Sequence, residues 1–373
     1  MTDFKTYKEL HPSNKYSNES GLYGHEAIWD LPSNDAEPQS PEIYLFPPRT
    51  PGFDLRRKKW GMYLSSGVTI PPMTNYSTVD LEVDQIRDVV WNEQAFENLV
   101  ADVDMKELIL ALVTNQLDSE TNTDLIENKG NGLIMLLHGP PGTGKTFTAE
   151  SVAEIAKKPL YPVTCGDIGT EPEKVEKYLE SVFHLGKIWD CVVLLDEAEV
   201  FLEQRTLQDL NRNALVSVFL RALEYYEGIL ILTTNRVGTF DEAFKSRIQL
   251  ALRYERLQRH ERKQIWRNFF NRLKKLEEGE TIDFDEIQEH MDELADYEMN
   301  GRQIRNSITT ARQLAKYKKK PMRFTHLKRA ITAAEKFDKY LADVREADVE
   351  DTGGRRGDGR YTDDYFARAD QIR

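Results

Sequence analysis

The sequence predicts an α/β fold in which a five-stranded parallel sheet with helices on both faces is followed by a small all-α domain. Two observations support this prediction. Between residues 132 and 254, apolar runs of strand length alternate with segments of helical periodicity, a pattern typical of repeated β-α-β units. After residue 255, the chain becomes highly charged and its apolar residues recur on one face of successive helices.

Residues 1–90 precede this fold and are predicted to be partly disordered. Prolines and polar residues dominate up to about residue 52. The stretch RRKKWGMYLSSGVTI then has short β-prone pieces, which we expect to be too few for an independent sheet. We interpret residues 1–52 as a loose leader or the end of a domain, and the β-prone pieces as a remnant that packs on the next domain.

The α/β domain is predicted over residues 91–255. It begins with a helical pattern over residues 91–117, for which Asp104 is a candidate N-cap. Five predicted strands follow in chain order: LIMLLH, LYPVTC, CVVLLD, GILILTT and IQLALRY. They are almost continuously apolar, so we expect crossover helices to cover both faces of a parallel sheet.

The all-α domain is predicted over residues 256–341. Its four amphipathic segments are ERKQIWRNFFNRLKKL, FDEIQEHMDELADY, GRQIRNSITTARQLAKYKK and FTHLKRAITAAEKFDKYL. Residues 342–373 are rich in glycine and charge with few branched apolar residues, and are predicted to be disordered.

Composition excludes several function classes. The 373 residues include 50 basic and 63 acidic side chains, a net charge of -13 that disfavours non-specific binding to nucleic acid. The two cysteines, Cys165 and Cys191, fit neither a disulfide framework nor a metal-binding spacing. Because the chain shows no signal peptide, transit peptide or membrane-span pattern, we expect an intracellular protein, cytoplasmic by default.

The strongest motif is a glycine-rich loop between the first predicted strand and a helix. Its glycines allow backbone N–H groups to surround a phosphate, the following helix directs its positive end there, and Lys145 adds a full charge. Thr146 offers a hydroxyl to Mg²⁺. The sequence thus predicts a P-loop NTPase sheet that binds the β- and γ-phosphates of a nucleotide together with Mg²⁺. The predicted nucleotide-binding residues are Gly139, Pro140, Pro141, Gly142, Thr143, Gly144, Lys145, Thr146 and Phe147.

Polar residues end two further apolar strands. Asp196 and Glu197 follow VVLL, and Asn235 follows GILILTT. In a parallel sheet such strand ends meet at the edge where ligands bind. We expect Asp196 to hold Mg²⁺ and Glu197 to act as general base or to orient the attacking water. Asn235 is expected to contact the γ-phosphate or that water.

These motifs resemble those of the AAA+ ATPases. GPPGTGKT is similar to the family's Walker A motif, VVLLDEAE to Walker B and TTNR to the end of the sensor 1 strand. The resemblance covers about residues 96–340. The phrases HGPPGTGKTFTAESVAE and NALVSVFLRALEYYEGILILTTNR most resemble fungal AAA ATPases with a longer N-terminal region.

The resemblance also implies roles for two arginines. Arg247, in FDEAFKSRI, matches the arginine that reaches a neighbouring subunit's nucleotide, and the alternative is a surface arginine beside an acidic strand. Arg302 matches the lid arginine called sensor 2, with Arg305 as the competing candidate.

The resemblance implies ATP hydrolysis by a homo-oligomer, such as a hexameric ring, that remodels a protein partner. The segment Cys165–Pro172 has no aromatic residue, which disfavours an unfoldase that grips polypeptide with aromatic pore loops. One alternative is a nucleotide-gated assembly protein with negligible hydrolysis. A nucleic-acid motor is disfavoured by the negative charge.

Overall fold

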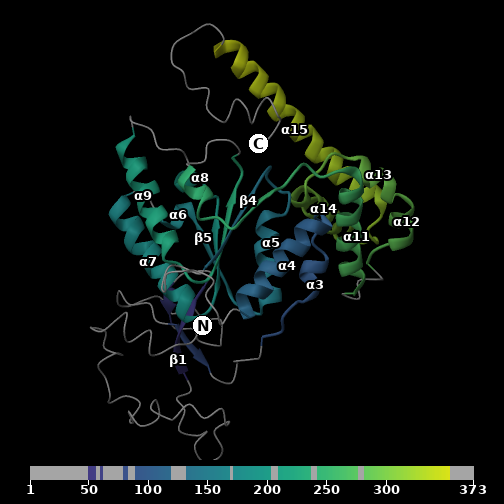
Figure 1. The fold of residues 1–373 in the computed structure, drawn as a ribbon. Coiled ribbons are helices and arrows are strands. Elements are labelled where there is room, and N and C mark those ends of the chain that lie inside the picture. Colours follow the sequence, from purple (N-terminus) through teal and green to yellow (C-terminus); the bar gives the residue numbers. More distant parts are fainter. Residues whose placement is uncertain are drawn as a thin grey trace, which may run out of the picture. The chain divides into compact units, whose positions relative to one another are not determined.

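The computed structural model describes residues 49–55, 59–61, 79–82, 89–118, 132–168, 171–202, 209–236, 242–275 and 281–352 (Figure 1). The disorder predicted for most of residues 1–90 and for residues 353–373 lies outside the described residues. None of the described helices is both long and apolar enough to cross a membrane.

A small antiparallel sheet lies in the N-terminal unit. It consists of β1 (Arg49–Asp54), β2 (Lys59–Gly61) and β3 (Val79–Glu82) in the order β2-β1-β3. Only β2 lies within the stretch RRKKWGMYLSSGVTI, and it joins a sheet whose other two strands come from before and after that stretch. The sequence pattern missed β1 because it contains Pro51 and Gly52, residue types that are depleted in strands.

The central sheet has five strands in the order β5-β6-β7-β4-β8. The registers of β4 with β7, β4 with β8, and β6 with β7 are parallel. This confirms the predicted α/β fold, and it places β7 between the strand before the phosphate loop and the strand that ends in acids. The strands are β4 (Leu133–His138), β5 (Leu160–Thr164), β6 (Val192–Asp196), β7 (Ile229–Thr234) and β8 (Leu250–Arg253).

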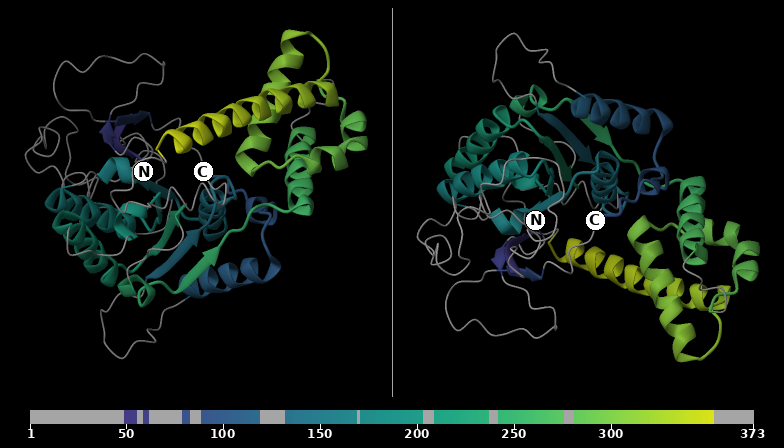
Figure 2. Two further views of the ribbon diagram at one scale, coloured as in Figure 1. Left: turned by 90° about the horizontal axis from the view of Figure 1, so that it is seen from above. Right: turned by 90° about the horizontal axis from the view of Figure 1, so that it is seen from below.

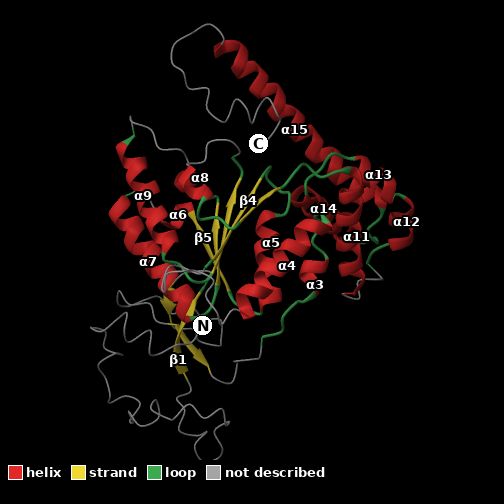
Figure 3. Cartoon of the chain, viewed as in Figure 1, coloured by secondary structure: helices red, strands yellow, loops and turns green. Residues whose placement is uncertain are grey.

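Helices cover both faces of this sheet (Figure 3). α7 packs against α9 on one face, while α3 and α4 pack against α5 on the other. All six residues of β7 are buried, as expected for a strand covered on both sides. The helices are α3 (Gln94–Glu97), α4 (Val103–Asp118), α5 (Lys145–Ala156), α6 (Cys165–Ile168), α7 (Pro172–Ile188), α8 (Glu199–Leu202), α9 (Leu210–Glu224) and α10 (Glu242–Lys245).

The helical pattern predicted over residues 91–117 is interrupted in the structure. It forms two helices, α3 and α4, because residues 98–102 leave the helical conformation. α4 begins at Val103, so Asp104 lies in its first turn and is not the N-cap. An acid in this position still interacts favourably with the helix dipole.

The C-terminal helices pack around a core of their own (Figure 2). The side chains of Trp266, Leu294 and Leu327 are fully buried at the centre of this core. Residues 342–352, predicted as part of a disordered tail, are helical, because no glycine interrupts the chain between Phe324 and Gly353. The helices are α11 (Arg259–Lys275), α12 (Phe284–Glu289), α13 (Met291–Asp296), α14 (Gly301–Tyr317) and α15 (Phe324–Thr352).

Candidate functional site

The glycine-rich loop connects β4 to α5 in a conformation that requires glycine. Gly139 has φ of 142°, and a Cβ atom there would lie 2.2 Å from the carbonyl oxygen of Tyr254. Gly144 has φ of 108° and immediately precedes α5, whose first turn receives no side-chain cap. The N–H groups of that turn are therefore open to an anion at the positive end of a 12-residue helix.

Lys145 places its ammonium group inside this loop. The side chain is buried, and Nζ donates hydrogen bonds to the carbonyl oxygens of Gly139 at 2.8 Å and Pro140 at 2.7 Å. Burial lowers the pKa of Lys145 to about 8, against the opposing effect of the nearby acids Asp196 and Glu199. The charge of Lys145 is thus costly without an anion, which is the electrostatic condition of a phosphate site.

Thr146 and Asp196 lie together beside the loop. The Thr146 hydroxyl is 3.3 Å and 3.4 Å from the two carboxylate oxygens of Asp196, although the two residues belong to different elements. Among the described residues, no cluster of three or more His, Cys, Asp or Glu side chains could hold a metal ion. Two protein oxygens nevertheless fit Mg²⁺, which is commonly held by one or two protein oxygens together with phosphates and water.

Glu197 follows β6 with its backbone in the left-handed region and its side chain exposed. Its φ of 58° is unusual for a residue with a Cβ atom. Its N–H donates to the hydroxyl oxygen of Thr233 at 3.1 Å, and the Thr233 hydroxyl in turn donates to the carboxylate of Asp196. The ends of β6 and β7 are therefore joined through side chains as well as through the ladder.

Asn235 lies half-buried at the end of β7, next to the acid-bearing strand. Its backbone N–H donates to Oε1 of Glu199 at 3.0 Å. Sequence reasoning did not single out Glu199, although it is the third acid in Asp196-Glu197-Ala198-Glu199. The fold thus brings Lys145, Asp196 and Asn235 to one edge of the sheet.

Arg247 is held within its own chain. Its guanidinium donates to the carbonyl oxygen of Ala243 at 2.9 Å and to Oε2 of Glu224 at 3.1 Å. The side chain is about a quarter exposed. In this arrangement Arg247 braces the segment before β8 against the end of α9.

The two lid arginines are exposed on the first turns of α14 and act on different groups. Burial is the main cause of the lowered pKa of Lys145, and the charge of Arg302 adds to it. Burial raises the pKa of Glu150 on α5, and the charge of Arg305 opposes that shift. Arg302 is therefore the one whose charge reaches the ammonium in the loop.

The start of α14 contacts the loop directly. The backbone N–H of Gly301 donates to the carbonyl oxygen of Gly142 at 2.9 Å. Asn300 caps α14 through a reciprocal pair of hydrogen bonds with Gln303, both at 2.9 Å. Sequence reasoning missed Asn300, although Asn-x-x-Gln before an apolar helix is a capping-box pattern.

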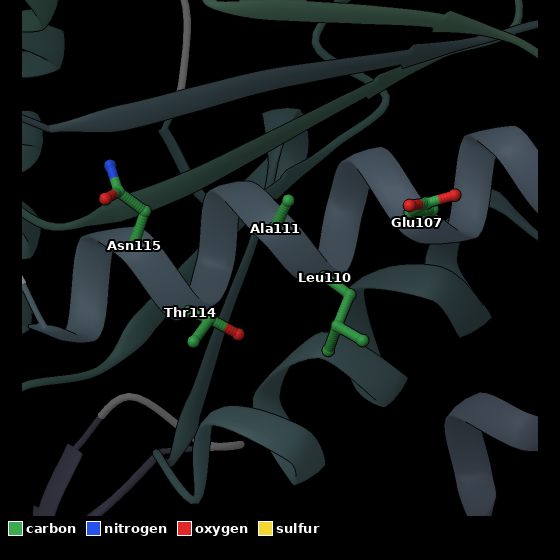
Figure 4. A pocket seen from close by; sticks show the side chains of 5 residues that line it. All are labelled: Glu107, Leu110, Ala111, Thr114 and Asn115. Carbon is green, nitrogen blue, oxygen red and sulfur yellow. The ribbon is translucent and has the colours of Figure 1, made fainter.

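A separate hollow lies along α4 (Figure 4). It has a volume of about 450 Å³ and contains none of the predicted site residues. The side chains that line it are Glu107, Leu110, Ala111, Thr114 and Asn115.

Two family models match the part of the chain that contains the candidate site and the C-terminal helices. The family model "ATPase family associated with various cellular activities (AAA)" matches residues 135–256, and the model "Fungal AAA+ ATPase lid domain" matches residues 257–348. The sequence is similar to human "ATPase family AAA domain-containing protein 3B", with 29% identity over 41% of this chain and 25% of the human protein. It is also similar to the "ATPase family AAA domain-containing protein 3A homolog" of Drosophila melanogaster, with 27% identity over 59% of this chain and 40% of that protein.

The chain thus matches two fifths or less of the length of these curated relatives. Among solved structures, the crystal structure of the FIGL-1 AAA domain in complex with ADP aligns with 19% identity and a TM-score of 0.48, over 66% of this chain and 89% of that chain.

Proposed function

Because the chain carries an AAA domain followed by a fungal AAA+ ATPase lid domain, we propose that it binds ATP with Mg²⁺ and hydrolyses it to ADP and phosphate. The observation that supports this proposal most strongly is the environment of Lys145. A buried ammonium group with a lowered pKa lies inside a glycine loop, next to a hydroxyl and a carboxylate suited to Mg²⁺.

The loop binds the phosphates in this proposal. The N–H groups at the start of α5 and the Lys145 ammonium hold the β- and γ-phosphates. Lys145 exchanges its bonds to the carbonyl oxygens of Gly139 and Pro140 for bonds to phosphate. Phe147, exposed on the first turn of α5, contacts the nucleotide. Thr146 and Asp196 hold Mg²⁺, which when bound neutralises charge on the phosphates.

Hydrolysis proceeds at the edge where β6 and β7 end. Glu197 accepts a proton from the attacking water as the water oxygen bonds to the γ-phosphorus, and the bond from phosphorus to the bridging oxygen breaks. ADP leaves with the electron pair of that bond. The side-chain amide of Asn235 orients the water or the γ-phosphate, and Arg302 supplies positive charge from the lid.

Variants of Lys145 and Glu197 test this proposal directly. Lys145→Ala is expected to lose binding of a fluorescent ATP analogue. Glu197→Gln is expected to retain that binding and to lose phosphate release. Undiminished binding by the first variant would contradict the loop assignment, and unchanged phosphate release by the second would remove Glu197 from its role.

Arg247 is proposed to act on the nucleotide of a neighbouring copy in a homo-oligomer, such as a hexameric ring. It must first leave Glu224, with which it pairs in its own chain. Arg247→Ala should then reduce phosphate release while ATP binding is retained. Glu224→Gln is the matched control, because it removes the same ion pair but keeps the arginine. Equal losses of activity and of thermal stability in both variants would leave Arg247 with a structural role only.

The pairing of Arg247 with Glu224 also favours a second candidate, a nucleotide-gated assembly protein with negligible hydrolysis. The two candidates differ in how phosphate release depends on protein concentration. Specific activity that rises with concentration supports the enzyme with an arginine in trans. Absence of phosphate release at every protein concentration, together with ATP-dependent assembly, supports the second candidate.

Remodelling of a protein partner is proposed as the output of the enzyme.

A further inference from the structure

Thr233 is the first of two buried threonines that end the otherwise apolar strand β7. It is the fifth residue of β7, ILILTT, and its side chain is 1% exposed. Threonine has nearly the shape of valine, so a strand position of this kind needs no hydroxyl group for packing. Burying a hydroxyl costs free energy unless it is hydrogen-bonded.

The Thr233 hydroxyl is bonded to both acid-bearing residues of the site. It donates its hydrogen to Oδ1 of Asp196, and its oxygen accepts the backbone N–H of Glu197 at 3.1 Å. A hydroxyl has one hydrogen and two lone pairs, so the two bonds can coexist. The backbone carbonyl of Thr233 also accepts the N–H of Ala198 at 2.9 Å. One residue therefore holds three successive residues at the end of β6.

These bonds set the geometry on which the chemistry depends. The bond to Asp196 fixes a carboxylate that faces the Thr146 hydroxyl at 3.3 Å. The bond to the N–H of Glu197 stabilises a backbone with φ of 58°, which is costly for a residue with a Cβ atom. If the hydroxyl were absent, Asp196 would lose a donor and the N–H of Glu197 would lose this acceptor.

We propose that Thr233 is a positioning residue that orients Asp196 toward Mg²⁺ and Glu197 toward the attacking water. The inference rests on the proposed function, because it assigns Thr233 to the same reaction. Thr233 would touch neither nucleotide nor metal, and it would act through the two acids.

Thr234 provides a matched control within the same strand. Its side chain is also 1% exposed, and its hydroxyl oxygen accepts the backbone N–H of Arg236 at 3.1 Å. Thr234→Val and Thr233→Val remove the same group from neighbouring positions. Only the second change removes bonds to Asp196 and Glu197.

The test compares Thr233→Val, Thr233→Ser and Thr234→Val in the full chain. Thr233→Val should lower the maximal rate of phosphate release about tenfold or more, as expected for the loss of a hydrogen bond to a charged group. Its affinity for a fluorescent ATP analogue without Mg²⁺ should stay within about twofold of wild type. Thr233→Ser should recover most of the rate, and Thr234→Val should stay close to wild type. A wild-type rate in Thr233→Val, or equal losses in the two valine variants, would overturn the inference.

A second readout separates this inference from the proposed hydrolysis. Mg²⁺ should strengthen binding of the ATP analogue by a smaller factor in Thr233→Val than in wild type, because Asp196 is no longer held. If the wild-type protein released no phosphate, the proposed hydrolysis would be refuted. The role of Thr233 would be refuted separately if Mg²⁺ strengthened binding by the same factor in Thr233→Val and in wild type.

If Thr233→Val does not fold, Thr233→Ala and Thr233→Ser replace it. Both variants lack the methyl group of threonine, and only Thr233→Ser keeps the hydroxyl. If Mg²⁺ strengthened binding of the ATP analogue equally in both, the inference would be refuted.

Discussion

If the chain binds ATP as proposed, the lowered pKa of Lys145 makes that binding depend on pH in a defined direction. Burial brings the pKa from 10.5 to about 8 in the nucleotide-free protein, which corresponds to a cost of roughly 3 kcal/mol for holding the charge. A bound triphosphate places negative charge beside the ammonium group, favours its protonated form and raises its pKa, and we take the ordinary lysine value of 10.5 for the complex. Above pH 8 the free protein has lost the proton that the complex keeps, and binding must take up a proton.

The magnitude follows from these two pKa values. At pH 9.5 a group with a pKa of about 8 is only about 3% charged, whereas a group with a pKa of 10.5 is about 90% charged. Binding at pH 9.5 should therefore take up about 0.9 proton, and affinity should fall roughly twentyfold between pH 7.5 and pH 9.5. Below pH 7.5 the contribution of Lys145 should be nearly constant, because both forms are protonated.

Titration calorimetry in two buffers of different ionisation heat measures this proton uptake. Mg²⁺-free buffer and a fluorescent ATP analogue give the affinity over the same pH range. Burial raises the pKa of Tyr254 to about 12, and the pKa of His138 is lowered from 6.5 by burial, so both residues titrate outside the range. Lys145→Arg keeps a charge at every pH tested, and its affinity should not vary with pH. A wild-type affinity that is flat from pH 7.5 to pH 9.5, with no proton uptake, would refute this reasoning.

Three further changes test the surroundings of the loop, each by urea unfolding. Gly301→Pro removes the N–H that bonds to Gly142, and it should lower the free energy of unfolding by about 1 kcal/mol even though proline suits the first position of a helix. Gly301→Ala keeps the N–H, so an equal loss of stability in that variant would contradict the explanation. Asn300→Ala removes the cap of α14 and should cost about 1 kcal/mol, with unchanged stability as the contrary result. Tyr254→Phe removes the 2.6 Å bond between its hydroxyl and that of Thr148 and should cost about 1 kcal/mol; a neutral effect would mean that this bond contributes nothing net.

Local patterns in the sequence were sufficient to predict the sheet and the edge at which the candidate site residues meet. The apolar runs that became β4, β6 and β7 have the length of strands and are too short for typical helices, which favours the strand assignment. Since parallel strands end at the same edge, the polar residues after each run, such as Lys145 and Asp196, could be expected to meet there.

Contacts between distant segments could not be predicted in the same way. Thr233 is separated from Glu197 by 36 positions, and their bond depends on the side-by-side register of β6 and β7. The contact between Gly142 and Gly301 depends on how the lid helices fold back on the loop. Both residues of that contact are glycines, so no side-chain pattern in the sequence indicates it.

The link between Gly142 and Gly301 runs from main chain to main chain. Apart from proline at position 301, which removes the donor, a replacement can weaken the link only by moving the backbone, because no side-chain atom takes part. Homologous chains could therefore diverge widely at the lid surface while the same link persisted. Any shift of the loop carbonyl that accompanies nucleotide entry would be passed straight to the first turn of α14, so the start of this helix is the place where lid movement should begin.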